Sequence, residues 1–421
     1  MKAITISPLF LFFFFSYLSP VVTQTALFAP VFKDPVSLLY TVTISLQTPP
    51  QPTKLHLDLS SSFTWLDCSI NYNSTTCQHI PCTSPLCTSF HSFACPNDTC
   101  SVYPENPITR QATLASAFLD CLALPTPSSP SQLHLIPGFL FSCSNTFLLT
   151  GLADQVTGLA AFGRSNLSLP AQISNSLSSP RYFALCLPSS TENPGVALFG
   201  TSGPYYLSSP PVDVSKSLAY TGLILNPVGS TVISYNQQPS DEYYINLTSI
   251  QVNGKDVPLN ISQLVINENG YGGTKLSTDT SYTILESSIY KAFVNAFVNE
   301  SSGFNLSVAS AVKPFDVCYE ARNMFSTRVG PGVPTVDLVM EKDDVFWRIF
   351  GGNSMVRIER DGIDVWCLGF VDGGINLRTP IVIGGHQMED NLLHFDLNSN
   401  RFGFSSTLLL QGTTCANFNS T

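Results

Sequence analysis

The stretch from Leu57 to Trp65 holds the residue types best suited to chemistry in this chain. Asp58 stands at the end of an apolar, strand-like stretch. Three serines lie just after it, and apolar and aromatic residues then resume. This order suits a side chain held at the base of a cleft. One carboxylate alone does little acid–base chemistry, because proton sharing needs a second acid whose charge interacts with the first. The interpretation of Asp58 therefore depends on whether it has a partner.

A second stretch, in the other half of the chain, indicates what stands at the partner position. A threonine and a large apolar residue lie six and seven residues after Asp58, and the same two types lie six and seven residues after Ser277. Counting from Asp279 instead puts Glu286 at a position that should be buried. Ser277 therefore occupies the partner position, and its hydroxyl does not titrate near neutral pH. Asp279 is interpreted as a solvated turn residue.

The second half of the chain repeats the organisation of the first around these two positions. An apolar run ends in glycine at Gly163, 105 residues after Asp58, and another ends at Gly385, 108 residues after Ser277. Apolar residues recur at helical spacing from Ile289 to Phe297, which predicts an amphipathic helix. We interpret the repeat as two copies of one lobe.

The composition predicts a mainly β protein with two duplicated lobes around a cleft. The chain has 421 residues, enough for two sizeable cores, and apolar and polar side chains alternate at residues 40–46 as in a half-buried strand. The formal net charge is −10 and lysine and arginine are not clustered, which argues against nucleic acid as a partner. The predicted N-terminal lobe, with a disulfide-rich insertion, spans residues 26–210, and the C-terminal lobe spans residues 211–421.

The first residues have the pattern of a secretory signal peptide. Lys2 precedes an apolar run from Leu9 to Phe15, and small or polar residues follow Pro20. We assign residues 1–25 to this signal, whose core is too short to span a membrane. No later stretch supplies about 20 unbroken apolar residues, so we expect a secreted, extracellular protein with no membrane partner after cleavage.

Twelve cysteines follow the signal, and an even number in a secreted chain predicts six disulfides. The cluster from Cys77 to Cys100 has four, four, seven and four residues between successive cysteines, unlike the paired C-x2-C spacing of structural zinc sites. The histidines are scattered, so we predict no metal and no cofactor. The twelve cysteines are Cys68, Cys77, Cys82, Cys87, Cys95, Cys100, Cys121, Cys143, Cys186, Cys318, Cys367 and Cys415.

Asparagine sequons predict glycosylation at the surface of a secreted chain. The chain has eight sequons, one of which, at Asn419, lies close to the C-terminus. The other seven are at Asn73, Asn97, Asn166, Asn246, Asn260, Asn299 and Asn305.

The two turns, the apolar strands that end in glycine and a segment around Tyr103 resemble pepsin-type aspartic proteases over nearly the whole mature chain. Within that fold, the chain resembles a plant group of basic seven-S globulins, gamma-conglutin-like proteins, dermal glycoproteins and proteinaceous inhibitors of xylanase and xyloglucan endoglucanase. The runs that carry this second resemblance are residues 273–278 (GTKLST), 288–293 (SIYKAF), 384–393 (GGHQMEDNLL) and 413–418 (TTCANF).

The resemblance implies an aspartic protease dyad, and three departures imply that this chain is not an enzyme. Active relatives carry Asp-Thr/Ser-Gly in each lobe, whereas here Leu59 and Ser60 follow the first aspartate. Ser277 replaces the second aspartate. The flap of active relatives has a tyrosine and a glycine-rich turn, and the matching stretch here is Tyr103-Pro104-Glu105-Asn106-Pro107, whose prolines stiffen a hairpin that would admit substrate. We therefore predict no catalytic residues, with Asp58 and Ser277 as vestiges.

Relatives that inhibit glycoside hydrolases present loops of the C-terminal lobe to the target's active-site cleft, so the resemblance implies a glycoside hydrolase as partner. In these relatives a basic side chain before the last cysteine meets the target's carboxylates, which lie about 5 Å apart in a retaining enzyme. Here the candidate loop residues are Gln411, Gly412 and Thr413, so the expected arginine is absent. Arg401 lies nearby in sequence and is interpreted as a hairpin turn residue.

The resemblance favours an inhibitor of xyloglucan endoglucanase or xylanase type that acts in plant defence. One alternative is an extracellular storage globulin that binds peptide or carbohydrate, although the sequence pI of about 5.0 fits poorly with relatives named for basicity. A second alternative is an atypical aspartic endopeptidase. For the cysteines, the resemblance implies the pairs Cys318–Cys367 and Cys186–Cys415.

Overall fold

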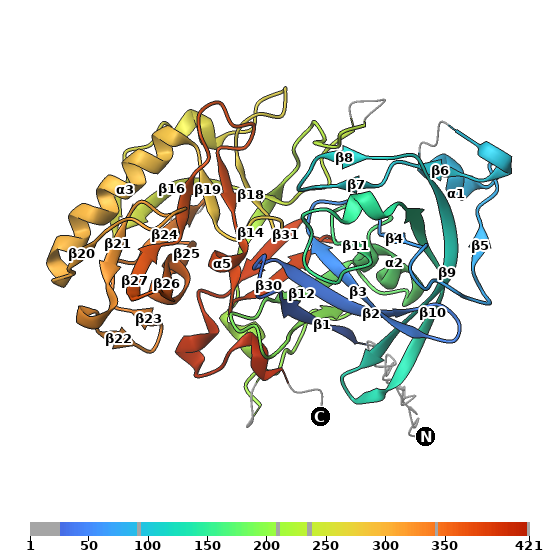
Figure 1. The fold of residues 1–421 in the computed structure, drawn as a ribbon, viewed down its shortest axis with the longest axis horizontal. Helices are drawn as coiled ribbons and strands as arrows, with labels where there is room; N and C mark the ends of the chain where they lie inside the picture. Colours follow the sequence, from blue (N-terminus) through green and yellow to red (C-terminus); the bar gives the residue numbers. More distant parts are fainter. Residues whose placement is uncertain (1–25, 91–93, 208–210, 234–237, 342–343, 419–421) are drawn as a thin grey trace, which may run out of the picture.

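The computed structural model describes residues 26–90, 94–207, 211–233, 238–341 and 344–418, and it shows two β-rich halves side by side (Figure 1). The predicted signal peptide, residues 1–25, the predicted lobe boundary at residue 210 and the sequon at Asn419 lie outside the described residues. Most of the regular structure is β-strand, as the composition predicted.

Among the described residues, one mixed sheet of 19 strands runs through both halves, with smaller sheets beside it. The first half contributes β1 (Leu27–Lys33), β2 (Tyr40–Leu46), β3 (Gln51–Asp58), β4 (Trp65–Asp67), β5 (Gln78–His79), β6 (Ser101–Val102), β7 (Glu105–Asn106), β8 (Gln111–Ala112), β9 (Ala115–Thr126), β10 (Ser129–Ser144), β11 (Gly158–Ala161), β12 (Tyr182–Cys186) and β13 (Gly195–Phe199).

The second half continues the large sheet and forms three of the smaller sheets, whereas β7 and β8 form a small sheet of the first half. Its strands are β14 (Ala219–Ile224), β15 (Tyr244–Ile245), β16 (Leu247–Val252), β17 (Lys255–Asp256), β18 (Thr274–Leu276), β19 (Thr283–Leu285), β20 (Val308–Ala309), β21 (Cys318–Glu320), β22 (Ser326–Thr327), β23 (Gly330–Pro331), β24 (Val336–Met340), β25 (Phe346–Ile349), β26 (Met355–Arg360), β27 (Ile363–Leu368), β28 (Phe370–Asp372), β29 (Ile381–Ile383), β30 (Leu392–Asp396) and β31 (Arg401–Phe404). The α-helices are α1 (Pro85–Ser89), α2 (Leu169–Ser176), α3 (Ser287–Ser301), α4 (Gly351–Ser354) and α5 (Gly385–Met388).

The predicted alternation at residues 40–46 is confirmed in β2. Its four apolar side chains, from Tyr40 to Leu46, are buried in the core, whereas Thr43 and Ser45 are only half-buried. Neighbouring strands of the sheet bury the same face, which fixes the register because a slip of one residue would expose every apolar side chain.

The strands that lead into the two turns have the same setting in each half. The first turn (residues 58–64) follows β3, which pairs parallel with β11 so that Ala161 lies opposite Asp58. The second turn (residues 277–282) follows β18, which pairs parallel with β29 so that Ile383 lies opposite Leu276. Each apolar run that ends in glycine therefore flanks one turn, as the duplicated-lobe interpretation predicted.

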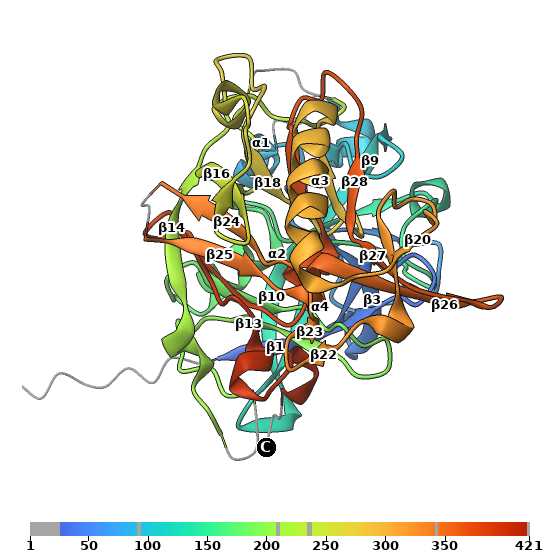
Figure 2. The ribbon, with the colours of Figure 1, turned by 90° about the vertical axis from the view of Figure 1, so that its left-hand side faces the viewer.

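The two halves are joined by strand pairing as well as by the chain that connects them. β12 lies antiparallel to β30, and at this junction the rings of Phe183 and Phe395 stack with centroids 4.4 Å apart. α3 covers one face of the second half (Figure 2), and its own Phe293 and Phe297 side chains are buried in the core. This confirms the amphipathic helix expected from Ile289 to Phe297.

The prediction of six disulfides is wrong for the described residues, in which five are formed. Cys77 and Cys121 are unpaired, although the charge of Asp120 acts on both thiols. The Cys77 thiol lies beside the Tyr72 hydroxyl, and the Cys121 sulfur lies 3.7 Å from the Leu122 carbonyl oxygen. Both pairs implied by the family resemblance are present. The five disulfides are Cys68–Cys143, Cys82–Cys95, Cys87–Cys100, Cys186–Cys415 and Cys318–Cys367.

The described part of the chain contains no helix that is long and apolar enough to cross a membrane. Within the same residues, no group of three or more His, Cys, Asp or Glu side chains is arranged to hold a metal ion. Four cysteines of the cluster considered for zinc, between Cys82 and Cys100, form two disulfides instead.

Glu389 is the centre of a buried network that joins the two halves. Its carboxylate accepts a hydrogen bond of 2.6 Å from the Tyr40 hydroxyl and lies 2.6 Å from Lys33 Nζ, both on strands of the first half. His386 Nδ1 lies 3.0 Å from the other carboxylate oxygen. Burial by itself raises the pKa of Glu389, but the bonds and charges of His386 and Lys33 outweigh it and hold the pKa below its ordinary value. Ionised Glu389 therefore stabilises the fold.

Glu389→Gln should lower the free energy of unfolding by about 3 kcal/mol near neutral pH, because Lys33 loses its buried counter-charge. The difference from the parent should shrink as the pH falls below about 4, since a group whose pKa is depressed by folding loses its stabilising effect on protonation. Urea-induced unfolding across this pH range measures both effects.

Glu359→Gln is the matched control, because the Glu359 carboxylate is 67% exposed and pairs with Arg357 at the surface. This substitution should change the free energy of unfolding by less than about 1 kcal/mol. Equal losses from the two substitutions at every pH would contradict the role assigned to Glu389.

Candidate functional site

The first turn buries Asp58 in hydrogen bonds from serine residues. Its Oδ1 accepts bonds of 2.6 Å from both the N–H and the hydroxyl of Ser60, and its Oδ2 accepts a bond from the Ser61 hydroxyl. The Asp58 side chain has no solvent exposure. Burial and the charge of Asp279 raise the pKa of Asp58 well above its ordinary value, against the opposing effect of the serine bonds.

One threonine of the second turn links the two turns. Thr278 Oγ1 donates a bond of 2.8 Å to the Leu57 carbonyl and accepts a bond of 3.2 Å from the Leu59 N–H. The equivalent position in the first turn is Leu59 itself, which has no hydroxyl to return the bond. Ser277 is buried in the second turn, and within the described residues no hydrogen bond joins it to Asp58.

Asp279 pairs with a buried histidine from the other lobe. Its Oδ1 lies 3.1 Å from His56 Nε2, and the exposed fractions of the two side chains are 12% and 0%. The interpretation of Asp279 as a solvated turn residue is therefore wrong. His56 lies on β3 two residues before Asp58, so strand alternation puts both side chains on one face. The two-residue spacing of His56 and Asp58 is the signal that the sequence offers for His56. Asp279 lies 223 residues from His56, so local spacing could not predict the pair.

The predicted flap, residues 103–107, is fixed to a segment from the second half, residues 226–233, which we call the strap. Glu105 accepts a bond of 2.7 Å from a strap N–H and forms an ion pair of 2.7 Å with Arg110, and Arg110 donates to a strap carbonyl. On the opposite side, Arg378 donates a bond of 3.0 Å to a second strap carbonyl. The strap is thus held from both lobes. The strap atoms in these three bonds are Val232 N, Ser230 O and Gly229 O.

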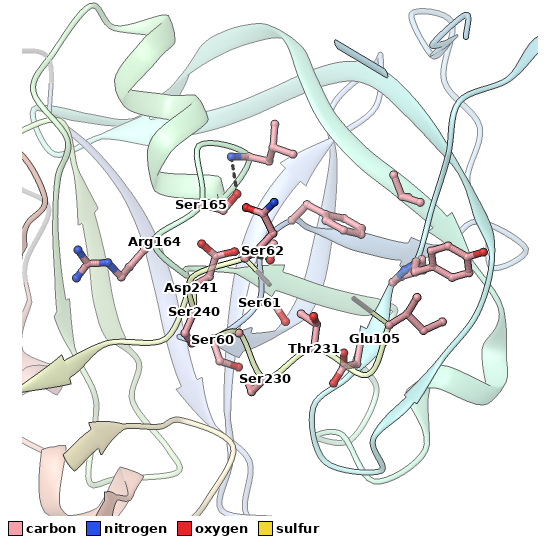
Figure 3. A pocket seen from close by; sticks show the side chains of 18 of the residues that line it. Ser60, Ser61, Ser62, Glu105, Arg164, Ser165, Ser230, Thr231, Ser240 and Asp241 are labelled. Atoms are coloured by element: carbon pink, nitrogen blue, oxygen red, sulfur yellow. Dashed lines mark hydrogen bonds between the residues drawn. The ribbon is translucent and has the colours of Figure 1, made fainter. Parts of the chain in front are cut away.

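A pocket of about 580 Å³ lies beneath the flap and the strap (Figure 3). Serines of the first turn, residues 164–167 after β11, and residues 238–241 complete its lining. The flap residues Tyr103 and Pro104 line the pocket, but neither Asp58 nor Ser277 does. Ser60 and Ser61, which line the pocket, thus separate Asp58 from it.

The loop before the last cysteine exposes part of the predicted inhibitory segment. A 3-10 turn over Leu408–Gln411 ends at Gly412, whose φ of 71° is a left-handed conformation that glycine tolerates. Gly412 is exposed, Gln411 is half-buried, and Leu410 beside them is 51% exposed. Thr413 is buried and its hydroxyl bonds to a backbone carbonyl of the first half. Thr413 therefore anchors the loop, and its neighbours form the accessible surface.

A hairpin next to this loop carries an exposed arginine that the sequence reasoning missed. β22 and β23 pair across a turn that holds Arg328, which takes part in none of the ion pairs among the described residues. The Gly352 N–H donates a bond of 2.7 Å to the Val329 carbonyl, and a Cβ on Gly352 would lie 3.6 Å from the Leu409 side chain. The hairpin and the loop therefore flank one glycine and share a surface.

Arg401 is held within the hairpin of β30 and β31. Its Nε donates a bond of 2.7 Å to Asp396, and its guanidinium carbon lies 4.4 Å from the centroid of the Tyr220 ring. These contacts occupy the guanidinium and agree with the interpretation of Arg401 as a hairpin residue.

Known proteins are similar to this chain in both sequence and fold. Residues 40–201 match the family described as "Xylanase inhibitor N-terminal", and residues 242–406 match "Xylanase inhibitor C-terminal". A Glycine max protein named "Probable aspartic proteinase GIP1" is 58% identical over 96% of this chain and 94% of its own length. "Gamma conglutin 1" from Prunus dulcis is 36% identical over 92% of this chain and 88% of its own length.

Solved structures with the same architecture confirm the predicted fold class, mainly β and bilobal of the pepsin-like type. The "Crystal structure of edgp" superimposes with a TM-score of 0.90 at 44% identity, covering 95% of this chain and 99% of that one. Basic 7S globulin from soybean superimposes with a TM-score of 0.78 at 29% identity, covering 94% of this chain and 100% of that one.

His56→Gln and Asp279→Asn should each destabilise the protein, and together they should cost less than the sum of the two, because either one removes the same contact. We expect a coupling free energy of about 1–2 kcal/mol from a double-mutant cycle in urea-induced unfolding. His134→Gln combined with Asp279→Asn is the control, because His134 lies opposite Leu124 in the β9–β10 hairpin, outside the turns. The control pair should be additive, and additivity of both pairs would refute the cross-lobe contact.

Ser277→Asp should not create a protease, because Asp58 is buried under its serine bonds and the strap fixes the flap. Cleavage of a denatured protein substrate at about pH 4, where a carboxylate dyad shares one proton, tests this variant and the parent with and without pepstatin. Neither should show pepstatin-sensitive cleavage. Pepstatin-sensitive activity of the parent that disappears in Asp58→Ala would instead establish an atypical aspartic endopeptidase.

Proposed function

Because this chain belongs to the xylanase-inhibitor family of pepsin-like proteins, we propose that it is a secreted, catalytically inactive member that inhibits cell-wall-degrading glycoside hydrolases in plant defence. The targets would be enzymes of the xyloglucan endoglucanase or xylanase type. The observation that carries the proposal is the exposed Arg328 beside the loop over residues 408–412. In Figure 1 the strands β22 and β23 that present Arg328 lie at the edge of the second half.

The chemistry of the target explains why a free arginine matters. A glycoside hydrolase has two catalytic carboxylates, about 5 Å apart in retaining enzymes and farther apart in inverting ones. A planar guanidinium with several N–H donors can bind such carboxylates in paired hydrogen bonds. Arg328 thus supplies the cation that Gln411 and Gly412 lack, and the exposed Leu410 adds apolar contact area beside it.

The proposal that the protein is catalytically inactive rests on the two turns. Asp58 and Ser277 act as vestiges of a catalytic dyad, because a serine hydroxyl cannot take the place of the second titrating carboxylate. Thr278 and the His56–Asp279 pair give the same turns a structural role. The Glycine max relative carries "aspartic proteinase" in its name, and the cleavage assay with Asp58→Ala decides whether that activity applies here.

The positions of the sequons support secretion and glycosylation. An oligosaccharide can be attached only where the asparagine side chain reaches solvent. Asn246 is half-buried, and the other six lie at exposed positions. The exposed six are Asn73, Asn97, Asn166, Asn260, Asn299 and Asn305.

Arg328→Ala should weaken inhibition of the target hydrolase by about thirtyfold or more, as expected when a central charged anchor of an interface is removed. The inhibition constant is measured on a panel of xyloglucan endoglucanases and xylanases. Gln411→Ala should have a smaller effect, because a neutral amide does not neutralise the target's carboxylates.

Arg322→Ala is the control for the loss of one positive charge. Arg322 is exposed and lies 3.9 Å from Glu320, on the chain just before the hairpin. The control should leave inhibition within about twofold of the parent, since surface charges outside the contact contribute little. Absence of inhibition by the parent across the whole panel would overturn the proposed function.

A further inference from the structure

The pocket beneath the flap has no part in the proposed contact with a hydrolase, and its lining suggests a ligand of its own. Its volume of about 580 Å³ falls within the range of small-molecule sites. Neither Arg328 nor the loop over residues 408–412 contributes to the lining. We propose that this pocket binds a short neutral oligosaccharide, without cleaving it.

The charged side chains of the lining are compensated by one another, which favours a neutral ligand. Two acids and two bases line the pocket. Glu105 pairs with Arg110 at 2.7 Å. Asp241 accepts a bond of 2.5 Å from the Ser62 hydroxyl, and the charge of Arg164, whose guanidinium bonds to Asn400 Oδ1 at 2.6 Å, offsets part of the cost of its burial. A charged ligand would have to displace one of these contacts in a site partly closed from water, at a cost in free energy.

The remaining polar groups of the lining are mainly hydroxyls. Figure 3 shows them on several segments around one space. The hydroxyls of Ser61, Ser62 and Ser240 already donate to Asp58, Asp241 and Glu242, so they offer a ligand only acceptor oxygens. The hydroxyls on the strap can both donate and accept, so the set as a whole matches a ligand that is itself rich in hydroxyls. The hydroxyl residues that frame the space are Ser61, Ser62, Ser165, Ser230, Thr231 and Ser240.

Aromatic side chains provide the second feature that a sugar ring requires. Phe63 and Phe90 line the pocket with their rings edge to face at 5.8 Å, and Tyr103 of the flap lines it as well. A sugar ring has C–H faces that pack on aromatic surfaces while its hydroxyls point outward. Hydroxyls and aromatic faces together therefore fit a chain of sugar rings.

An extended peptide fits this pocket less well. A peptide that binds along a flap needs backbone N–H and C=O groups with which to pair. Pro104 and Pro107 of this flap have no N–H. Glu105 and Asn106 already pair with the opposite strand of the β7–β8 hairpin. The sequence of the flap thus removes most of the main-chain partners that a peptide would use.

The pocket also lacks the groups for glycosidic cleavage. Hydrolysis of a glycosidic bond needs one carboxylic acid and one carboxylate free to act on the bond. Glu105 and Asp241 are engaged by Arg110 and Ser62, and Asp58 lies outside the lining. The oligosaccharide would therefore bind to the pocket and dissociate from it without being cleaved.

Isothermal titration calorimetry of the full-length secreted protein tests the proposal with four probes. Cellotriose and xylotriose are the neutral sugars, trigalacturonic acid is the anionic sugar, and N-acetyl-tri-alanine amide is the neutral peptide. We expect saturable binding of at least one neutral sugar, and weaker or no binding of the other two probes. Preferential binding of the acid or the peptide, or no binding of either neutral sugar, would overturn the proposal.

Two substitutions locate the binding in the pocket. Thr231→Trp fills the space from the strap, and Leu225→Trp fills it from the preceding segment, where the side chain is 48% exposed and tolerates enlargement. Either should weaken sugar binding by about tenfold or more. Thr191→Trp is the control, because Thr191 is exposed on the loop between β12 and β13. Unchanged affinity in a folded pocket variant would show that the sugar binds elsewhere.

Hydrolase inhibition by the same variants separates this proposal from the proposed function. Thr231→Trp should inhibit the target as the parent does, because the strap is not part of the surface around Arg328. Loss of sugar binding with intact inhibition is therefore the expected result. A protein that inhibits no hydrolase can still bind the sugar, so the two proposals fail independently.

Discussion

One hydroxyl bonds the two lobes directly beside Asp58 at the cleft floor. Thr278 reaches across to the backbone on both sides of Asp58, and Leu59 cannot return the contact. A one-sided link would leave the two turns free to separate, and the His56–Asp279 pair adds a second contact at the same place. Once the turns are joined in this way, Asp58 is covered and the floor of the cleft is a structural core.

The parts of the molecule that can meet a partner are held by contacts which do not involve the turns. The strap fixes the flap from both lobes, and Gly352 brings the Arg328 hairpin against the loop over residues 408–412. In the first arrangement hydrogen bonds from Glu105 and Arg110 join two segments, and in the second a close approach at Gly352 does so. A preorganised surface of this kind loses little conformational entropy on binding.

Much of the fold could be predicted because it follows local patterns, whereas the site depends on distant contacts. The alternation in β2 and the helical spacing of α3 are written into short stretches, and the spacing from Asp58 and Ser277 aligned the two turns with the strands that flank them. The His56–Asp279 pair and the surface shared by Arg328 and Leu410 join residues far apart in sequence, and no local period reports such contacts. The cysteines show the same limit: the even number of cysteines suggested six bonds, but the count cannot show that Cys77 and Cys121 remain free in the fold.

The disulfide between Cys186 and Cys415 has a consequence for the covalent integrity of the molecule. It ties a residue of the first half to the C-terminal segment across 229 residues of sequence. A single cut of the backbone anywhere between these two cysteines would leave both fragments in one covalent molecule. Together with the β12–β30 pairing, the bond would hold the fragments in place, so that a two-chain form would separate only after reduction.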